Sequence, residues 1–257
     1  MNFLYAFILS AVEGITEFLP ISSTGHLILT SYLLQIKETD FVTTFQIVIQ
    51  VGAIFAVVFL YWKEFIKGKE IWLRILAAFL PTAIVGYVLF KFIKTVLLGS
   101  VPTVLWSLFI GGIVLILLEM YIKKKELPIK KIEQMTYFQA FLVGVSQSFS
   151  VIPGVSRSGA TIFGALLQGI NRETAVEFSF LLAVPTMIAA TGLDLVKSNF
   201  SFTTGEIMLL IFGVIVSFLT ALAAVKLFVT YISKHTFIAF AVYRILLAVV
   251  FFLFFYR

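Results

Sequence analysis

The sequence contains no cysteine and few charged residues, and both shortages narrow the classes of protein to which it can belong. Without cysteine, the 257-residue chain forms no disulfide and offers no thiolate ligand to a metal. Charged residues make up only 12% of the chain, roughly half the usual share of a soluble domain. Hydrophobic residues make up 61%, and the mean hydropathy is +1.09. Secreted, nucleic-acid-binding and disordered classes are therefore poor fits, and the composition predicts a polytopic helical membrane protein.

Six apolar stretches are long enough to cross a bilayer as helices. They cover approximately 41–62, 72–92, 102–122, 174–197, 205–225 and 236–256. Two further apolar regions, 2–36 and 137–170, are broken by proline, glycine and hydroxyl residues into halves too short to span. Such halves predict re-entrant helical hairpins whose tips stop inside the membrane, where protein or a wet cavity must surround the irregular backbone.

The two halves of the chain share landmarks at a nearly constant offset of 133 or 134 residues. For example, "SSTG" at 22–25 falls on "SRSG" at 156–159. We therefore predict one all-α integral-membrane domain over 1–257, with internal repeats 1–124 and 137–257. Each repeat would be a re-entrant hairpin plus three transmembrane helices. Because three is odd, the second repeat would enter from the opposite face, as an inverted-topology repeat.

The distribution of basic residues indicates an orientation for this arrangement. With the 63–74 loop in the cytoplasm, the inside loops carry eleven Lys and Arg residues and the outside segments carry five. The positive-inside rule favours this orientation, and it accounts for the net charge of +6 without nucleic acid. We therefore expect a multi-pass protein of the bacterial cytoplasmic membrane, with both termini and the first hairpin on the outer side.

The motif "EGITEFLPISSTGH" at 13–26 places two carboxylates in an apolar segment. Glu13 and Glu17 are four residues apart and therefore share one face of a helix. Burying two like charges is costly, so a shared proton, an arginine or a divalent cation must stabilise them. His26 lies within two turns of the pair, which makes it a candidate proton carrier, nucleophile or metal ligand.

The middle of the same motif predicts a helix break followed by a new helix. Pro20 ends the first helix, and three hydroxyl residues offer caps for the second: Ser22, Ser23 and Thr24. Free N–H groups at the N-terminus of a helix bind anions. Because small hydroxyl residues are usually packing residues in membrane helices, only their position beside the acids and the histidine makes them candidates for substrate binding.

The motif "PGVSRSGAT" at 153–161 has the same order of breaker, capping hydroxyls and helix start. Arg157 is expensive to place inside a membrane, and its rigid fork of donors suits bidentate binding of phosphate. Three hydroxyl residues would complete an anion nest around it: Ser156, Ser158 and Thr161. Alternatively, Arg157 is a structural partner of Glu13 or Glu17, and both interpretations can hold before substrate arrives.

Another arginine, Arg244, lies within the last apolar stretch and needs an acidic or carbonyl partner there. Glu119 and Glu177 are the acids that we expect to supply it. The two hairpin tips together predict a polar pocket halfway into the membrane, suited to a phosphorylated ligand with an apolar tail.

At these residues the chain resembles the bacitracin-resistance type of undecaprenyl-diphosphate phosphatase. The resemblance rests on the two motifs above and on "EFSFLLAVP" at 177–185, and it covers essentially the whole chain. It implies removal of the terminal phosphate from undecaprenyl diphosphate, giving undecaprenyl phosphate and inorganic phosphate. This reaction recycles the lipid carrier for peptidoglycan synthesis and confers resistance to bacitracin.

The resemblance also implies roles for individual residues. The acidic pair of the family falls on Glu13 and Glu17, which would hold a divalent cation such as Mg²⁺ or Ca²⁺. Its hydroxyl, histidine and phosphate-binding arginine fall on Ser23, His26 and Arg157. The sequence leaves three alternatives for the identity of the nucleophile. The first is direct attack by His26, and the second is attack by Ser23 with His26 or a glutamate as base. The third is attack by water with a glutamate as base.

A different class of function remains an alternative. Inverted repeats with broken helices at the midplane are typical of secondary transporters, so the chain could move undecaprenyl phosphate or another anionic lipid between leaflets. The acid pair with a histidine is more than a binding site needs, which favours the enzyme. The expected partners are undecaprenyl diphosphate and the lipid bilayer, and the sequence leaves open whether the chain forms a homodimer.

Overall fold

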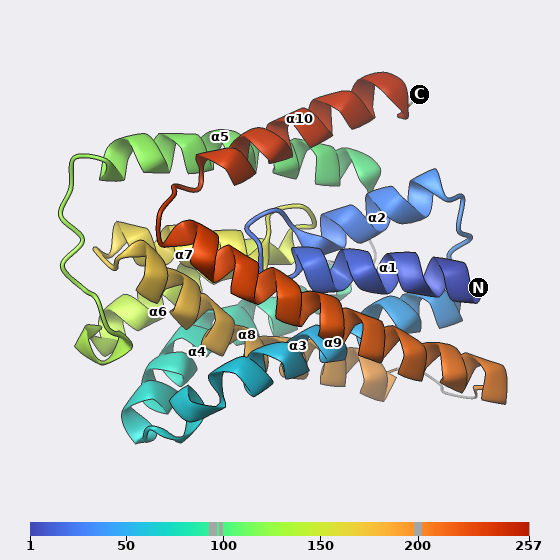
Figure 1. Cartoon of the computed structure of the whole chain (residues 1–257), viewed down its shortest axis with the longest axis horizontal. Coiled ribbons are helices and arrows are strands. Elements are labelled where there is room, and N and C mark those ends of the chain that lie inside the picture. Colours follow the sequence, from blue (N-terminus) through green and yellow to red (C-terminus); the bar gives the residue numbers. More distant parts are fainter. Residues whose placement is uncertain (93–96, 98–99, 198–201, 257) are drawn as a thin grey trace.

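A computed structural model describes the whole chain apart from residues 93–96, 98–99, 198–201 and 257 (Figure 1). The described part is built from helices, which confirms the predicted all-α class. The α-helices are α1 (Phe3–Thr16), α2 (Ser23–Leu33), α3 (Asp40–Ile66), α4 (Lys69–Phe92), α5 (Val101–Ile122), α6 (Tyr137–Ser148), α7 (Arg157–Leu167), α8 (Arg172–Lys197), α9 (Thr204–Ile232) and α10 (Ile238–Phe254). Two short 3-10 helices, η2 (Ile132–Gln134) and η3 (Phe149–Val151), precede and follow α6. Lys94 and Arg257, which enter the charge count, lie outside the described residues.

Within the described residues, five helices are long and apolar enough to cross a membrane: α3, α4, α5, α8 and α9. They match five of the six expected spans. The sixth expected span, 236–256, corresponds to α10, an apolar helix of only 17 residues. The chain is therefore a multi-pass membrane protein by the length and composition of its helices, and many of their apolar side chains are exposed as a lipid environment requires.

Both interrupted regions form pairs of short helices, as predicted. The break between α1 and α2 ends at Ser22, and the break between α6 and α7 ends at Ser156. The two serines have the same unusual backbone, with φ of 72° and 79°, in the left-handed region that non-glycine residues rarely occupy. Each serine hydroxyl accepts a hydrogen bond from the N–H of the glycine three residues later, Gly25 at 3.2 Å and Gly159 at 3.1 Å. The two helix starts are thus built in the same way.

The first helix of each pair packs against a long helix from the other half of the chain. Helix α1 contacts α9, and α6 contacts α4. Glycine makes both contacts close, because a Cβ at Gly14 would lie 2.4 Å from the carbonyl oxygen of Ser217, and one at Gly144 would lie 2.0 Å from that of Ala78. Helices α5 and α10 also pack together, at the top of Figure 1. This exchange of helices between halves brings the two breaks together in the interior.

Candidate active site

The centre of the candidate site is an ion pair between the two hairpins. Glu17 follows directly after α1, and Arg157 is the first residue of α7. Their Oε1 and Nη2 atoms are 2.8 Å apart, and the side chains are only 8% and 11% exposed. A buried ion pair is tolerable only when further hydrogen bonds satisfy both groups. The expected structural partnership of Arg157 with an acid is therefore present, and it is Glu17 rather than Glu13 that makes it.

The remaining donors of Arg157 are only partly used. Its Nη1 donates to the carbonyl oxygen of Ser179 at 3.0 Å, and its guanidinium lies 5.6 Å from the centre of the Phe18 ring. Its Nε is buried and has no hydrogen-bond partner among the described residues. Leaving a buried donor unpaired costs about 1–3 kcal/mol, so an incoming acceptor such as a phosphate oxygen would be stabilised there.

Ser23 occupies the other oxygen of Glu17. The Ser23 hydroxyl donates a hydrogen bond to Oε2 of Glu17, and Ser23 is the first residue of α2. Glu17 therefore connects a hydroxyl from the first hairpin with a guanidinium from the second. A hydroxyl in contact with a base that a third group orients is the usual arrangement of an activated nucleophile.

Glu13 lies one turn earlier on α1 and is completely buried. Neither of its carboxylate oxygens has a hydrogen-bond partner among the described residues. An unpaired carboxylate in an apolar interior requires a proton or a cation. Carboxylate oxygens are the ligands that Mg²⁺ and Ca²⁺ prefer, so Glu13 together with Glu17 fits such an ion. In the described part of the chain no three acidic or histidine side chains are placed to share a metal ion, so phosphate oxygens, water or other protein oxygens would complete the coordination.

His26 is half-buried on α2, and both of its ring nitrogens are engaged. Its Nδ1 lies 2.7 Å from the carbonyl oxygen of Ser22, and its Nε2 lies 2.8 Å from the hydroxyl of Tyr243. A carbonyl oxygen only accepts, so Nδ1 carries a proton. No contact joins His26 directly to the acid pair.

Most of the other predicted binding hydroxyls make bonds within the protein. Ser22 and Ser156 are the helix caps described above. Ser158 donates to the carbonyl oxygen of Leu19 at 2.6 Å, which links the second hairpin to the tip of the first. The Thr161 hydroxyl is hydrogen-bonded to that of Ser179 at 2.6 Å. These hydroxyls hold the tips in place, whereas Thr24 is only half-buried in the first turn of α2.

Arg244 has backbone partners rather than the acids expected from the sequence. It is 1% exposed and donates to five carbonyl oxygens at 2.9–3.3 Å. These belong to Ser107, Leu108, Pro20, Gly154 and Val155. The expectation that Glu119 or Glu177 pairs with Arg244 was wrong. Glu119 pairs with Arg172 instead, at 2.5 Å, because both lie near the ends of their helices and away from the hairpin tips.

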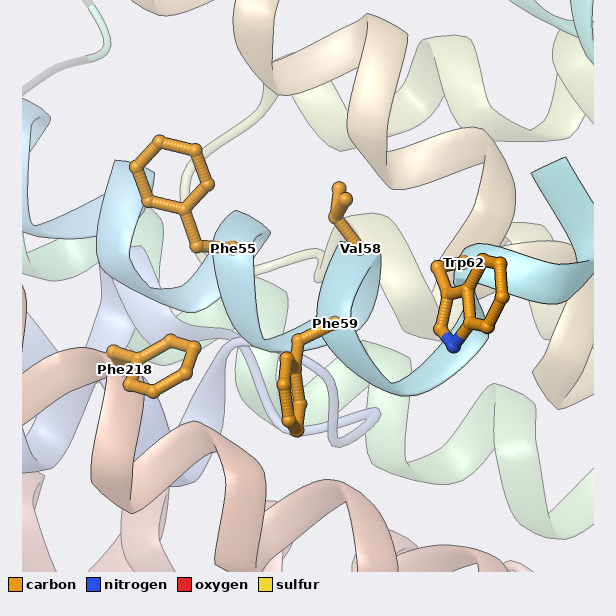
Figure 2. A pocket seen from close by; sticks show the side chains of 5 residues that line it. All are labelled: Phe55, Val58, Phe59, Trp62 and Phe218. Carbon is orange, nitrogen blue, oxygen red and sulfur yellow. The ribbon is translucent and has the colours of Figure 1, made fainter. Parts of the chain in front are cut away.

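Two hollows on the surface of the described residues lie away from the acid pair. An apolar groove of about 480 Å³ is lined on α3 and α9 by Phe55, Val58, Phe59, Trp62 and Phe218. Figure 2 shows these side chains along α3, with Phe218 of α9 beside them. A polar hollow of about 430 Å³ is lined mainly by glutamates and lysines, among them Glu64, Lys67 and Glu177. Neither hollow includes a residue of the two motifs.

Several residues at the site carry no signal of their own in the sequence. Ser179 and Met187 contact the guanidinium of Arg157, and Tyr243 contacts His26. Ser179 lies inside the "EFSFLLAVP" segment, so the resemblance pointed to its neighbourhood. Tyr243 and Met187 resemble ordinary apolar positions of membrane helices, and only the packing identifies them.

Comparisons with known proteins agree with these motifs. Residues 6–250 match the sequence profile of the family described as "Bacitracin resistance protein BacA". A protein of Aquifex aeolicus named undecaprenyl-diphosphatase is 52% identical over 257 residues, which cover 97% of each chain. A protein with the same name from Sulfurihydrogenibium sp. is 50% identical, over 98% of this chain and 99% of its own length. Another, from Methanococcus aeolicus, is 44% identical over 100% of both chains.

We predict that Arg244→Lys destabilises the fold strongly although the charge is kept. An ammonium has three donors, so at least two of the five carbonyls would lose their partner, at about 1–3 kcal/mol each. The expected loss of about 2–6 kcal/mol would appear as a lower unfolding temperature in detergent. Lys226→Arg, on the exposed face of α9, is the control and should unfold as the wild type does. An unchanged unfolding temperature for Arg244→Lys would contradict the prediction.

Proposed function

The chain belongs to the BacA family and is an undecaprenyl-diphosphatase, and we propose that it cleaves its substrate where the two hairpin tips meet. The observation that carries this proposal is the buried chain of contacts from Ser23 through Glu17 to Arg157. It combines a hydroxyl, a base and a phosphate-binding cation. The substrate contributes a charged diphosphate and an apolar tail, which agrees with a polar site surrounded by membrane helices.

Arg157 binds the diphosphate in this proposal. Its unpaired Nε and the N–H groups at the start of α7 offer donors to phosphate oxygens. Donors that already point toward the site stabilise the negative charge that accumulates on the transferred phosphoryl group. Glu17 keeps the guanidinium in place before the substrate arrives. Arg157 therefore has a structural role first and a substrate-binding role afterwards.

Ser23 is the nucleophile in the proposed reaction. Its Oγ forms a bond to the terminal phosphorus while the bond from that phosphorus to the bridging oxygen breaks, and undecaprenyl phosphate leaves. The hydroxyl proton passes to Oε2 of Glu17, with which it is already hydrogen-bonded. Water then attacks the phosphoserine, inorganic phosphate leaves, and the proton on Glu17 returns to the serine oxygen.

His26 accepts the proton of the attacking water in the second step and then releases it to solvent with the departing phosphate, which returns the ring to its neutral form. Because Nδ1 donates to the carbonyl of Ser22, the neutral ring carries its lone pair on Nε2, and that nitrogen is the base. We favour Ser23 over direct attack by His26, because the Ser23 hydroxyl already contacts its base.

Glu13 and Glu17 hold a divalent cation in the proposal. Bound there, Mg²⁺ or Ca²⁺ would neutralise charge on the phosphate oxygens. The burial of Glu13 supports this assignment, because its carboxylate oxygens accept no hydrogen bond from a donor group among the described residues and so need a proton or a cation.

The two halves are inverted-topology repeats in the proposed membrane arrangement, each a re-entrant hairpin with three spans. The matching backbone of Ser22 and Ser156 and the exchange of α1 and α6 between halves support it. The excess of Lys and Arg in the loops around 63–74 and 123–131 supports a cytoplasmic position for those loops. The first hairpin, and with it the active site, then opens to the outer side of the cytoplasmic membrane.

We predict that purified protein releases phosphate from undecaprenyl diphosphate, and that Glu17→Gln, Arg157→Ala and Ser23→Ala each lower kcat by roughly 10²-fold or more. Glu126→Gln, on the loop after α5, is the control and should keep wild-type activity. A phosphoserine trapped on Ser23 after rapid quenching would support the nucleophile, and full activity of Ser23→Ala would exclude it. Lipid that binds without any phosphate release would instead support the transporter.

We predict that a chelator abolishes phosphate release and that Mg²⁺ or Ca²⁺ restores it. Because binding to the native state alone raises stability, the cation should also raise the unfolding temperature of the wild type. Glu13→Gln keeps the shape of the side chain and removes a ligand, so neither response should occur at the same cation concentration. Equal cation-dependent stabilisation of wild type and Glu13→Gln would exclude Glu13 as a ligand.

We predict that an impermeant maleimide added to intact cells labels Glu38→Cys but not Leu127→Cys. The wild type has no cysteine, so each variant carries a single label site. Residue 38 lies between α2 and α3, on the proposed outer side, and residue 127 follows α5 on the proposed cytoplasmic side. Labelling of Leu127→Cys alone would reverse the orientation. Both variants should react after the cells are permeabilised.

A further inference from the structure

His26 is held by a side chain from the far end of the sequence. Its Nε2 lies 2.8 Å from the hydroxyl of Tyr243, which is 217 residues away on α10. The two rings are also stacked, with centroids 5.6 Å apart and planes inclined by 7°. A stacking contact and a hydrogen bond from the same tyrosine fix both the plane of the imidazole and the direction of Nε2.

The two hydrogen bonds of His26 together select one form of the ring. The Ser22 carbonyl requires a proton on Nδ1, so in the neutral ring Nε2 has no proton and accepts from the Tyr243 hydroxyl. Arg244, the next residue on α10, is the nearest charged group from that helix, and its donors are used by backbone carbonyls. Tyr243 is therefore the side-chain partner of His26 within the described residues.

We propose that Tyr243 is a positioning residue for the hydrolysis, acting through His26. The inference rests on the proposed function, in which Nε2 is the base for the attacking water. The tyrosine keeps Nε2 unprotonated and the ring immobile between turnovers. In the proposed step the attacking water replaces the Tyr243 hydroxyl at Nε2 while the stacked ring remains in place. The imidazole is thus oriented before water arrives, which lowers the entropic cost of ordering the base for the reaction.

The kinetic test compares Tyr243→Phe with the wild type in phosphate release. Phenylalanine keeps the stacked ring and removes the hydroxyl, so kcat should fall about tenfold, the scale of one lost hydrogen bond, with KM unchanged. In a His26→Ala background the same substitution should not lower kcat further, because the side chain through which Tyr243 acts is absent. Tyr32→Phe, which removes a hydroxyl that donates to the Phe255 carbonyl at 3.3 Å, is the control and should keep wild-type kcat.

A spectroscopic test reads His26 directly and needs no turnover. The chain has two histidines, so ¹⁵N-histidine labelling gives two sets of ring signals, and His235→Gln assigns them. Tyr243→Phe should shift the Nε2 signal of His26 and leave the signals of His235 unchanged. The inference is overturned if that signal does not move, if kcat of Tyr243→Phe equals that of the wild type, or if kcat falls equally without His26. An inactive wild type would instead refute the proposed function.

Discussion

The fold depends on how a broken backbone can be kept inside a membrane. Carbonyl groups at the hairpin tips have no helical partner, and hydrocarbon offers none. One guanidinium meets this requirement for both tips at once, because Arg244 donates to Pro20 in the first tip and to Gly154 and Val155 in the second. Its approach needs Gly111 of α5, where a Cβ would lie 2.0 Å from Nη2. Arg244, whose charge is the most costly of the last helix to bury, is therefore the residue that makes the two breaks possible.

Bringing the tips together creates a site that neither half contains. The offset of 134 residues places Gln147 at the position of Glu13 and Arg157 at that of Ser23. Gln147 donates to Thr82 at 2.8 Å and leaves only its own Oε1 without a partner, whereas Glu13 has no hydrogen-bond partner on either oxygen among the described residues. The two hairpins thus share a backbone plan and differ in chemistry. One supplies acids, a hydroxyl and a histidine, and the other supplies the guanidinium that we propose to bind phosphate.

The sequence predicted the features that follow from local chemistry. Proline, glycine and capping hydroxyls mark both breaks, and the cost of burying charge singled out Glu17 and Arg157, which do meet. It could not predict which partner a buried arginine takes. Acids were expected to pair with Arg244, but backbone carbonyls without a helical partner compete for the same donors. The sequence does not show which carbonyls these are. For the same reason the sequence could not tell whether the hydroxyls of Ser158 and Thr161 bond a ligand or other groups of the protein. Tyr243 could not be identified either, because no motif surrounds it.

The clamp at Arg244 also bears on how the protein responds to the bilayer around it. Long helices tilt when a membrane becomes thinner or thicker, and their ends move by several ångströms. Glu17 and Arg157 sit beside tips that are fixed to one side chain, so tilting of the outer helices would carry both reacting groups as a unit. Mechanical strain from hydrophobic mismatch would then be absorbed at the helix ends and loops. The distance between Glu17 and Arg157 would stay constant across membranes of different lipid composition.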